Sequence, residues 1–182
     1  MKERIGILPN LITSVRIVGT LALLPIRPLS AGFYWVYTLT GLTDALDGLV
    51  ARATRTASAL GAKLDSAADL LFYAVMLIRI LPELWRVLPG AIWFAVGFVL
   101  ALRLTAYAVA AVKYRKFASL HTYGNKLTGL MVFAVPYFLL TAWAVPLCWA
   151  VCCVGILSSG EELAIHLRSK EYRSGVKTIF TK

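Results

Sequence analysis

The chain has 182 residues, of which 59% are hydrophobic and 15% are charged, and its net charge is +10. A soluble domain of this size is closer to half apolar, so the composition argues against one and predicts a single small membrane domain over residues 1–182. Basic residues are favourable beside anionic lipid headgroups. Because no zinc-finger spacing and no basic patch interleaved with aromatic residues occurs, we expect no nucleic-acid partner.

Six apolar segments follow one another along the chain, each long enough as a helix to span the hydrocarbon core of a bilayer. We therefore predict an all-α integral membrane fold with six transmembrane helices, at about 10–29, 31–53, 59–81, 88–112, 124–143 and 145–167. Prolines near the expected ends, such as Pro28 and Pro82, punctuate these helices, whereas Pro136 falls inside the fifth. Before the first span, residues 2–13 are expected to form either a short interfacial amphipathic helix or a flexible tail.

Basic residues are distributed unevenly over the connections between the predicted spans. An even number of spans puts both termini on one side, which carries most of the lysines and arginines, whereas the other side carries only Arg27, Arg79 and Arg86. Lys and Arg in short loops favour the cytoplasm. We therefore expect a multi-pass protein of the inner or plasma membrane, with both termini and the 52–63 connection facing the cytoplasm.

The four aspartates of the chain all lie around that connection, at positions 44, 47, 65 and 69. Helical spacing puts the first two on one face at the end of the second span, and the last two on one face at the start of the third. A short link makes these two helices antiparallel neighbours. We therefore expect the four carboxylates to point into one cavity.

Four like charges in a weakly polar setting require compensation, and hard divalent cations such as Mg²⁺ or Ca²⁺ suit carboxylate oxygens. Two such ions can clamp a phosphoryl group during a displacement, and the fourth carboxylate can remain a base. Gly48, Gly61 and Ala51 leave room for a nucleotide or diphosphate to approach the backbone. Arg52 offers donors to phosphate oxygens. The alternative is that the aspartates pair with arginines such as Arg52 or Arg103.

Written out, residues 44–69 read D-x-x-D-G-x-x-A-R-x8-G-x-x-x-D-x-x-x-D. This pattern matches the signature of the CDP-alcohol phosphatidyltransferase family at every fixed position, so the chain resembles that family. The resemblance implies a six-helix membrane enzyme, usually homodimeric, with its site open to the cytoplasmic leaflet. Such an enzyme transfers a phosphatidyl group from CDP-diacylglycerol to a small alcohol in phospholipid biosynthesis and releases CMP.

The same resemblance implies roles for individual residues. Two metal ions, Mg²⁺ or Mn²⁺, would be bound by Asp44, Asp47, Asp65 and Asp69. Asp69 would also be the general base on the acceptor hydroxyl. The CDP site would be lined by Gly48, Ala51, Arg52 and Gly61. The segment Pro9–Thr13 with Arg16 is similar to first spans of the family as well, which would bring Asn10 to the bound donor or headgroup.

The acceptor alcohol is less clearly indicated. Candidates for binding a phosphorylated acceptor are Arg103 in the fourth span, Lys126 entering the fifth and His121 in the polar stretch before it. Burial of an unpaired guanidinium is costly, so a bound phosphate would compensate Arg103; alternatively Arg103 pairs with a motif aspartate or reaches the interface. Lys126 has the alternative role of an interfacial anchor. His166 is expected to be an ordinary interfacial residue.

Glycerol 3-phosphate leads among the acceptors because it is the commonest one among bacterial relatives. The glycerol-phosphate subgroup, however, typically has a proline after the third aspartate and a lysine after the fourth, where this chain has Ser66 and Leu70. A phosphatidylserine synthase-like activity and an inositol phosphate acceptor are therefore the alternatives. The rival of a different class is a cation transporter, although transport sites tend to lie near the bilayer midplane rather than at a cytoplasmic boundary.

Overall fold

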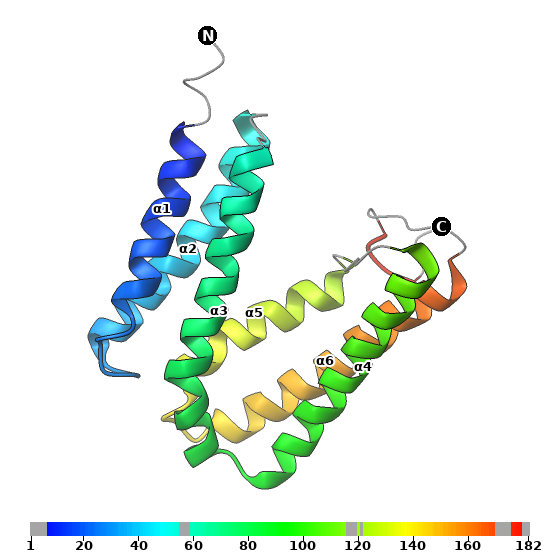
Figure 1. The fold of residues 1–182 in the computed structure, drawn as a ribbon. Coiled ribbons are helices and arrows are strands. Elements are labelled where there is room, and N and C mark those ends of the chain that lie inside the picture. The colour runs from blue at the N-terminus through cyan, green and yellow to red at the C-terminus, as the bar shows by residue number, and fades with distance from the viewer. Residues whose placement is uncertain (1–6, 55–58, 116–119, 121, 170–175, 180–182) are drawn as a thin grey trace. The chain divides into compact units, whose positions relative to one another are not determined.

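The computed structural model of the chain has six α-helices and no strand within the residues that it describes, which are 7–54, 59–115, 120, 122–169 and 176–179 (Figure 1). Within these ranges, side chains are described outside residues 7–12, 44–54 and 59–63. The helices are α1 (Ile7–Ala22), α2 (Ala31–Thr54), α3 (Ala59–Val87), α4 (Gly90–Tyr114), α5 (Tyr123–Phe138) and α6 (Ala144–Arg168). The all-α prediction is confirmed for this part of the chain.

Three helices end away from the expected ends of their spans. α1 stops at Ala22, because a proline at position 25 removes a backbone donor and disfavours helical conformation in the residue before it. The turn that follows includes Leu29 with a φ of 58°. α5 stops at Phe138, whereas α3 continues through Pro82, which was expected at a helix end, as far as Val87.

Two of the helices whose residues are described, α4 and α6, are long and apolar enough to cross a bilayer. On α4, large apolar side chains face outward, and Phe94 and Val112 are each 84% exposed. Exposed apolar surface of this kind fits a lipid environment better than water. Six membrane spans and a single domain over the whole chain stay predictions.

The helices divide into two compact units, residues 1–86 and 87–182. In the first unit α1 packs along α2, and the two backbones approach closely at Gly19, where an added Cβ would lie 2.7 Å from Oγ1 of Thr40. Small residues at helix interfaces allow this kind of close approach.

Aromatic stacking joins α2 to α3 in the same unit. The ring of Tyr37 stacks between those of Phe33 and Phe72, with 5.8 Å between the ring centroids of each pair. Farther along α3, Nη2 of Arg79 donates to the backbone carbonyl of Ile26. These contacts hold α3 beside α2 and beside the turn that follows α1.

In the second unit α6 packs against both α4 and α5. At Gly155 of α6 an added Cβ would lie 3.2 Å from Val99 of α4 and 3.9 Å from Thr128 of α5. The missing side chain therefore lets both neighbours approach α6 at one level. Toward its C-terminal end the buried face of α6 changes from apolar to polar residues, which are Ser158, Ser159, Glu162 and His166.

Candidate active site

The aspartate motif falls on two helices, as the spacing predicts. Asp44 and Asp47 lie in α2, and Asp65 and Asp69 lie in α3. Members of each pair are three or four residues apart, so each pair shares one helix face. Because the side chains at positions 44 and 47 lie outside the described residues, the convergence of four carboxylates stays a prediction.

The structure describes the residues expected at the CDP site by their backbone alone. Gly48, Ala51 and Arg52 belong to α2, Gly61 belongs to α3, and Asn10 belongs to α1. His121 lies outside the described residues. The roles expected for these residues at a CDP or acceptor site stay predictions.

Arg16 of α1 pairs with both Asp65 and Asp69. Nη1 of Arg16 donates to Oδ1 of Asp65 at 2.8 Å and to Oδ1 of Asp69 at 2.9 Å. These distances are typical of charge-assisted hydrogen bonds between a guanidinium and a carboxylate. The arginine side chain is 2% exposed, whereas the carboxylate side chains are 47% and 44% exposed.

Arg16 was not among the arginines expected to pair with the motif. The signal in the sequence was a lone charge within the apolar run of the first span, which is costly in a membrane helix unless it has a partner. That signal predicts that a partner exists but does not identify it, since Asp65 and Asp69 are 49 and 53 residues away.

The chemistry of the described donors fits a divalent cation. Carboxylate oxygens are the ligands that Mg²⁺ and Mn²⁺ prefer, and the two carboxylates of α3 are partly open to the surroundings. One guanidinium against two carboxylates leaves a formal charge of −1. Among the side chains that the structure describes, no group of three or more metal-binding residues gathers, so a complete metal site stays a prediction.

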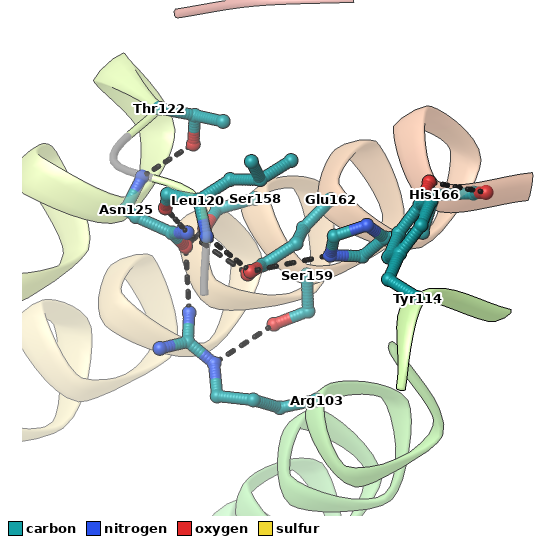
Figure 2. Close-up of polar contacts among 9 residues, drawn as sticks. All are labelled: Arg103, Tyr114, Leu120, Thr122, Asn125, Ser158, Ser159, Glu162 and His166. Atoms are coloured by element: carbon teal, nitrogen blue, oxygen red, sulfur yellow. Dashed lines mark hydrogen bonds and ion pairs between the residues drawn. The ribbon is translucent and has the colours of Figure 1, made fainter. Parts of the chain in front are cut away.

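Arg103 occupies a polar cluster of the second unit (Figure 2). From α4 its Nη2 donates to Oδ1 of Asn125 at 2.8 Å, and its Nε makes a longer contact of 3.4 Å to Oγ of Ser159. Both partners are neutral, and no carboxylate among the described residues of this unit pairs with Arg103. The half-buried guanidinium therefore has no oppositely charged partner among these residues, and a bound anion would supply one.

Asn125 of α5 is oriented by its own partners. Its Nδ2 donates to the carbonyl of Leu120 at 2.7 Å and to Oε2 of Glu162 at 2.9 Å, and the hydroxyl of Ser158 donates to its Oδ1. With both ends of the amide engaged, Oδ1 is directed at Arg103. At the first turn of α5, Thr122 accepts from the backbone N–H of Asn125 at 3.2 Å and caps the helix.

Glu162 and His166 are buried parts of this cluster that sequence reasoning missed. Glu162 is fully buried and accepts from the backbone N–H of Leu120 at 2.8 Å. Nε2 of His166 lies 3.9 Å from Oε1 of Glu162, and its ring packs on Tyr114 with 5.6 Å between centroids. The expectation that His166 is interfacial is wrong, because Glu162 of α6 and Tyr114 of α4 pack against its side chain, which is buried. The available signal was the spacing of four residues between Glu162 and His166 within an apolar helix.

Lys126 is exposed at the first turn of α5, one residue beyond Asn125. Its backbone N–H donates to the carbonyl of Thr122 at 3.1 Å, whereas its ammonium makes no hydrogen bond or ion pair with the residues that the structure describes. The ammonium is therefore available to an anionic ligand or a lipid headgroup, and both roles expected for Lys126 remain open.

Comparison with known proteins gives a family match over most of the chain. A family model described as CDP-alcohol phosphatidyltransferase matches residues 6–157. Over 99 residues the chain is 37% identical to a Pseudomonas fluorescens protein named CDP-diacylglycerol--glycerol-3-phosphate 3-phosphatidyltransferase, a stretch that is 47% of this chain and 48% of that protein. The chain thus spans about half the length of the curated relative that it matches. No solved structure matches it.

Proposed function

The chain belongs to the CDP-alcohol phosphatidyltransferase family, and on this premise we propose that it transfers a phosphatidyl group from CDP-diacylglycerol to the hydroxyl of a small alcohol. CMP is the second product, and the reaction belongs to phospholipid biosynthesis. The observation that supports this proposal most directly is the pair of half-exposed carboxylates, Asp65 and Asp69, at the spacing of the family motif.

The metal ligands that we propose are the four motif aspartates, Asp44, Asp47, Asp65 and Asp69. Two Mg²⁺ or Mn²⁺ ions, when bound there, would stabilise negative charge on the attacking and leaving oxygens of a phosphoryl transfer. The residues proposed to line the CDP site are Gly48, Ala51, Arg52, Gly61 and Asn10. Helical spacing of the motif on α2 and α3 supports these assignments.

Asp69 is proposed as the general base. Its carboxylate accepts the proton of the acceptor hydroxyl while the acceptor oxygen forms a bond to the phosphatidyl phosphorus. The bond between that phosphorus and the CMP phosphate oxygen breaks, and CMP leaves with the electron pair.

Glycerol 3-phosphate is the leading acceptor, and the name of the Pseudomonas relative, which is similar over about half of each chain, supports it. Arg103, Lys126 and His121 are proposed to bind its phosphate, and the neutral partners of Arg103 support this role. Because Ser66 and Leu70 depart from the glycerol-phosphate pattern, serine and inositol phosphate remain the alternative acceptors.

The proposed setting is the inner or plasma membrane. We assign one span to each of the six helices, with both termini and the site on the cytoplasmic side, and a homodimer as the assembled form. The outward apolar side chains of α4 and the excess of basic residues in the even-numbered connections support this setting.

Release of CMP tests the proposed reaction. Purified full-length chain in detergent is supplied with Mn²⁺, CDP-diacylglycerol and, separately, glycerol 3-phosphate, serine or inositol phosphate. We expect CMP release with glycerol 3-phosphate, and we expect Asp69→Asn to lower the rate by about 100-fold or more, because a general base contributes roughly 10²–10⁴-fold.

Glu83→Gln is the matched control, since it removes a carboxylate near the other end of α3 that pairs with Arg86 at 3.3 Å. This variant should retain wild-type activity. Full activity of Asp69→Asn would exclude Asp69 as the base. Absence of CMP release with every acceptor would contradict the transfer reaction, whereas release with serine or inositol phosphate alone would replace the acceptor and keep the reaction.

A further inference from the structure

Arg16 is the largest fully buried side chain among those that the structure describes, and its charge faces the motif carboxylates. We propose that Arg16 is a positioning residue that fixes Asp65 and Asp69 in the orientation needed to bind a divalent cation. This inference rests on the proposed function only in taking Asp65 and Asp69 as metal ligands.

Because Arg16 is buried, its guanidinium stays in place and the two carboxylates orient toward it. A guanidinium that is 2% exposed cannot satisfy its charge with water, so its bonds to the two carboxylates are strongly favoured over solvation. α1 holds it in place on both sides: Thr13 and Thr20, about one helical turn away in each direction, are also buried. The arginine is therefore a fixed point, and the aspartates orient toward it.

Both carboxylates are held through one atom. Because Nη1 donates to Oδ1 of Asp65 and to Oδ1 of Asp69, these oxygens lie within reach of the same donor, one helical turn apart on α3. Each carboxylate has a second oxygen that these two bonds do not use. Since about half of each aspartate side chain is exposed while Arg16 is buried, the arginine engages the carboxylates from the protein side.

The charges of Arg16, Asp65 and Asp69 are compatible with binding of a cation. The one positive charge of Arg16 offsets only one of the two carboxylate charges, so its pairing does not replace a divalent ion. Hydrogen bonds to metal-binding carboxylates orient them, and removal of such a partner typically weakens metal affinity by about 10–100-fold. Without Arg16 the two carboxylates would repel each other and lose their common orientation.

Binding of Mn²⁺ to the full-length chain in detergent, without lipid substrate, tests this role. Arg16→Gln should raise the Kd for Mn²⁺ about 10–100-fold. Arg16→Lys should raise it less, because an ammonium keeps the charge on a shorter side chain but lacks the planar fork. It also provides a folded variant if Arg16→Gln does not fold. The stabilisation of each variant by Mn²⁺ in thermal unfolding should fall in the same order, because it depends on the Kd.

Arg79 provides the matched control in the same unit, because its guanidinium donates to the backbone carbonyl of Ile26 rather than to a carboxylate. Arg79→Gln and Arg79→Lys are expected to lower the Tm without changing the Kd for Mn²⁺. A purely structural role for Arg16 would give the same pattern in its own variants and would overturn the inference.

A lower Kd in the Arg16 variants would also overturn it, since Arg16 would then compete with the cation. If wild-type protein shows no saturable Mn²⁺ binding, the metal site and the inference fail together. If Mn²⁺ binds in an Arg16-dependent way but no acceptor yields CMP, the proposed reaction fails and the positioning role stands.

Discussion

Arg103 is a half-buried guanidinium whose partners on α5 and α6 are neutral. Asn125 is fixed by Glu162 and by the carbonyl of Leu120, so the bond that it accepts from Arg103 sets the direction of the guanidinium without neutralising it. A charge that is positioned but not compensated is suited to bind an anionic group of a substrate.

Replacement of Arg103 by alanine should therefore act on the acceptor. Hydrogen bonds to charged groups contribute about 1.5–3 kcal/mol, which corresponds to roughly a 10- to 100-fold increase in KM for glycerol 3-phosphate. The KM for CDP-diacylglycerol should not change. Ser159→Ala is the matched control, because it removes only the long 3.4 Å contact and leaves the charge. An unchanged KM for glycerol 3-phosphate in Arg103→Ala would contradict the role in acceptor binding.

Between elements of the first unit, α1 and α2 approach each other closely at Gly19. The Cβ of an alanine at position 19 would clash with Oγ1 of Thr40. Thr40 is buried, and its hydroxyl donates to the carbonyl of Val36 at 2.7 Å. Rotation of its hydroxyl away from α1 would break that bond. The glycine thus sets the distance between the helix that holds Arg16 and the helix that holds Asp44 and Asp47.

This packing predicts that the effect of Gly19→Ala on the free energy of unfolding changes sign when Thr40 is also replaced by alanine. Gly19→Ala should destabilise the protein by about 1–3 kcal/mol through overpacking, less the gain of roughly 1 kcal/mol in helix propensity. In a Thr40→Ala background the clash is absent, so the same substitution should become stabilising. Unfolding of the detergent-solubilised variants measures both effects. Equal effects of Gly19→Ala in the two backgrounds would show that Thr40 does not limit the approach.

For the molecule as a whole, the proposed membrane setting rests on its apolar surface and its basic connections. Aromatic and aliphatic side chains stand exposed on several helices, among them Trp35, Leu70, Phe94 and Leu157. Water would make such a surface costly, whereas lipid chains would not. In the proposed topology, the turns between α1 and α2 and between α5 and α6 would lie on the non-cytoplasmic side.

Cysteine labelling of intact cells tests this topology. In a variant whose three native cysteines are replaced, a membrane-impermeant maleimide should label Ser30→Cys and Thr141→Cys from outside, because these residues follow an odd number of spans. Ser169→Cys, after α6, should react only once the membrane is permeabilised. Permeabilised cells provide the control for reactivity at all three positions. Labelling of Ser169→Cys in intact cells would contradict cytoplasmic termini.

Local patterns predicted much of the fold and of the motif. Runs of apolar residues indicated the six helices, and a spacing of three or four residues placed each aspartate pair on one helix, because both depend on interactions between residues close in the sequence. Helix ends were predicted less well: Pro25 stops α1, whereas α3 continues through Pro82. A proline lacks the same hydrogen bond in both places, and tertiary packing determines whether the helix tolerates the loss.

The sequence by itself determined an apolar helical chain, a charge asymmetry and a motif of eight fixed positions within residues 44–69 that is typical of its family, since each depends on residue type and local spacing. Only the tertiary structure decided how the charges within the apolar helices are paired. Burial makes a partner necessary for Arg16 and for Glu162, but Arg16 pairs with carboxylates 49 and 53 residues away, and Glu162 accepts from donors 42 and 37 residues away. Residue type predicts the cost of burying a charge, whereas helix packing selects the group that offsets it.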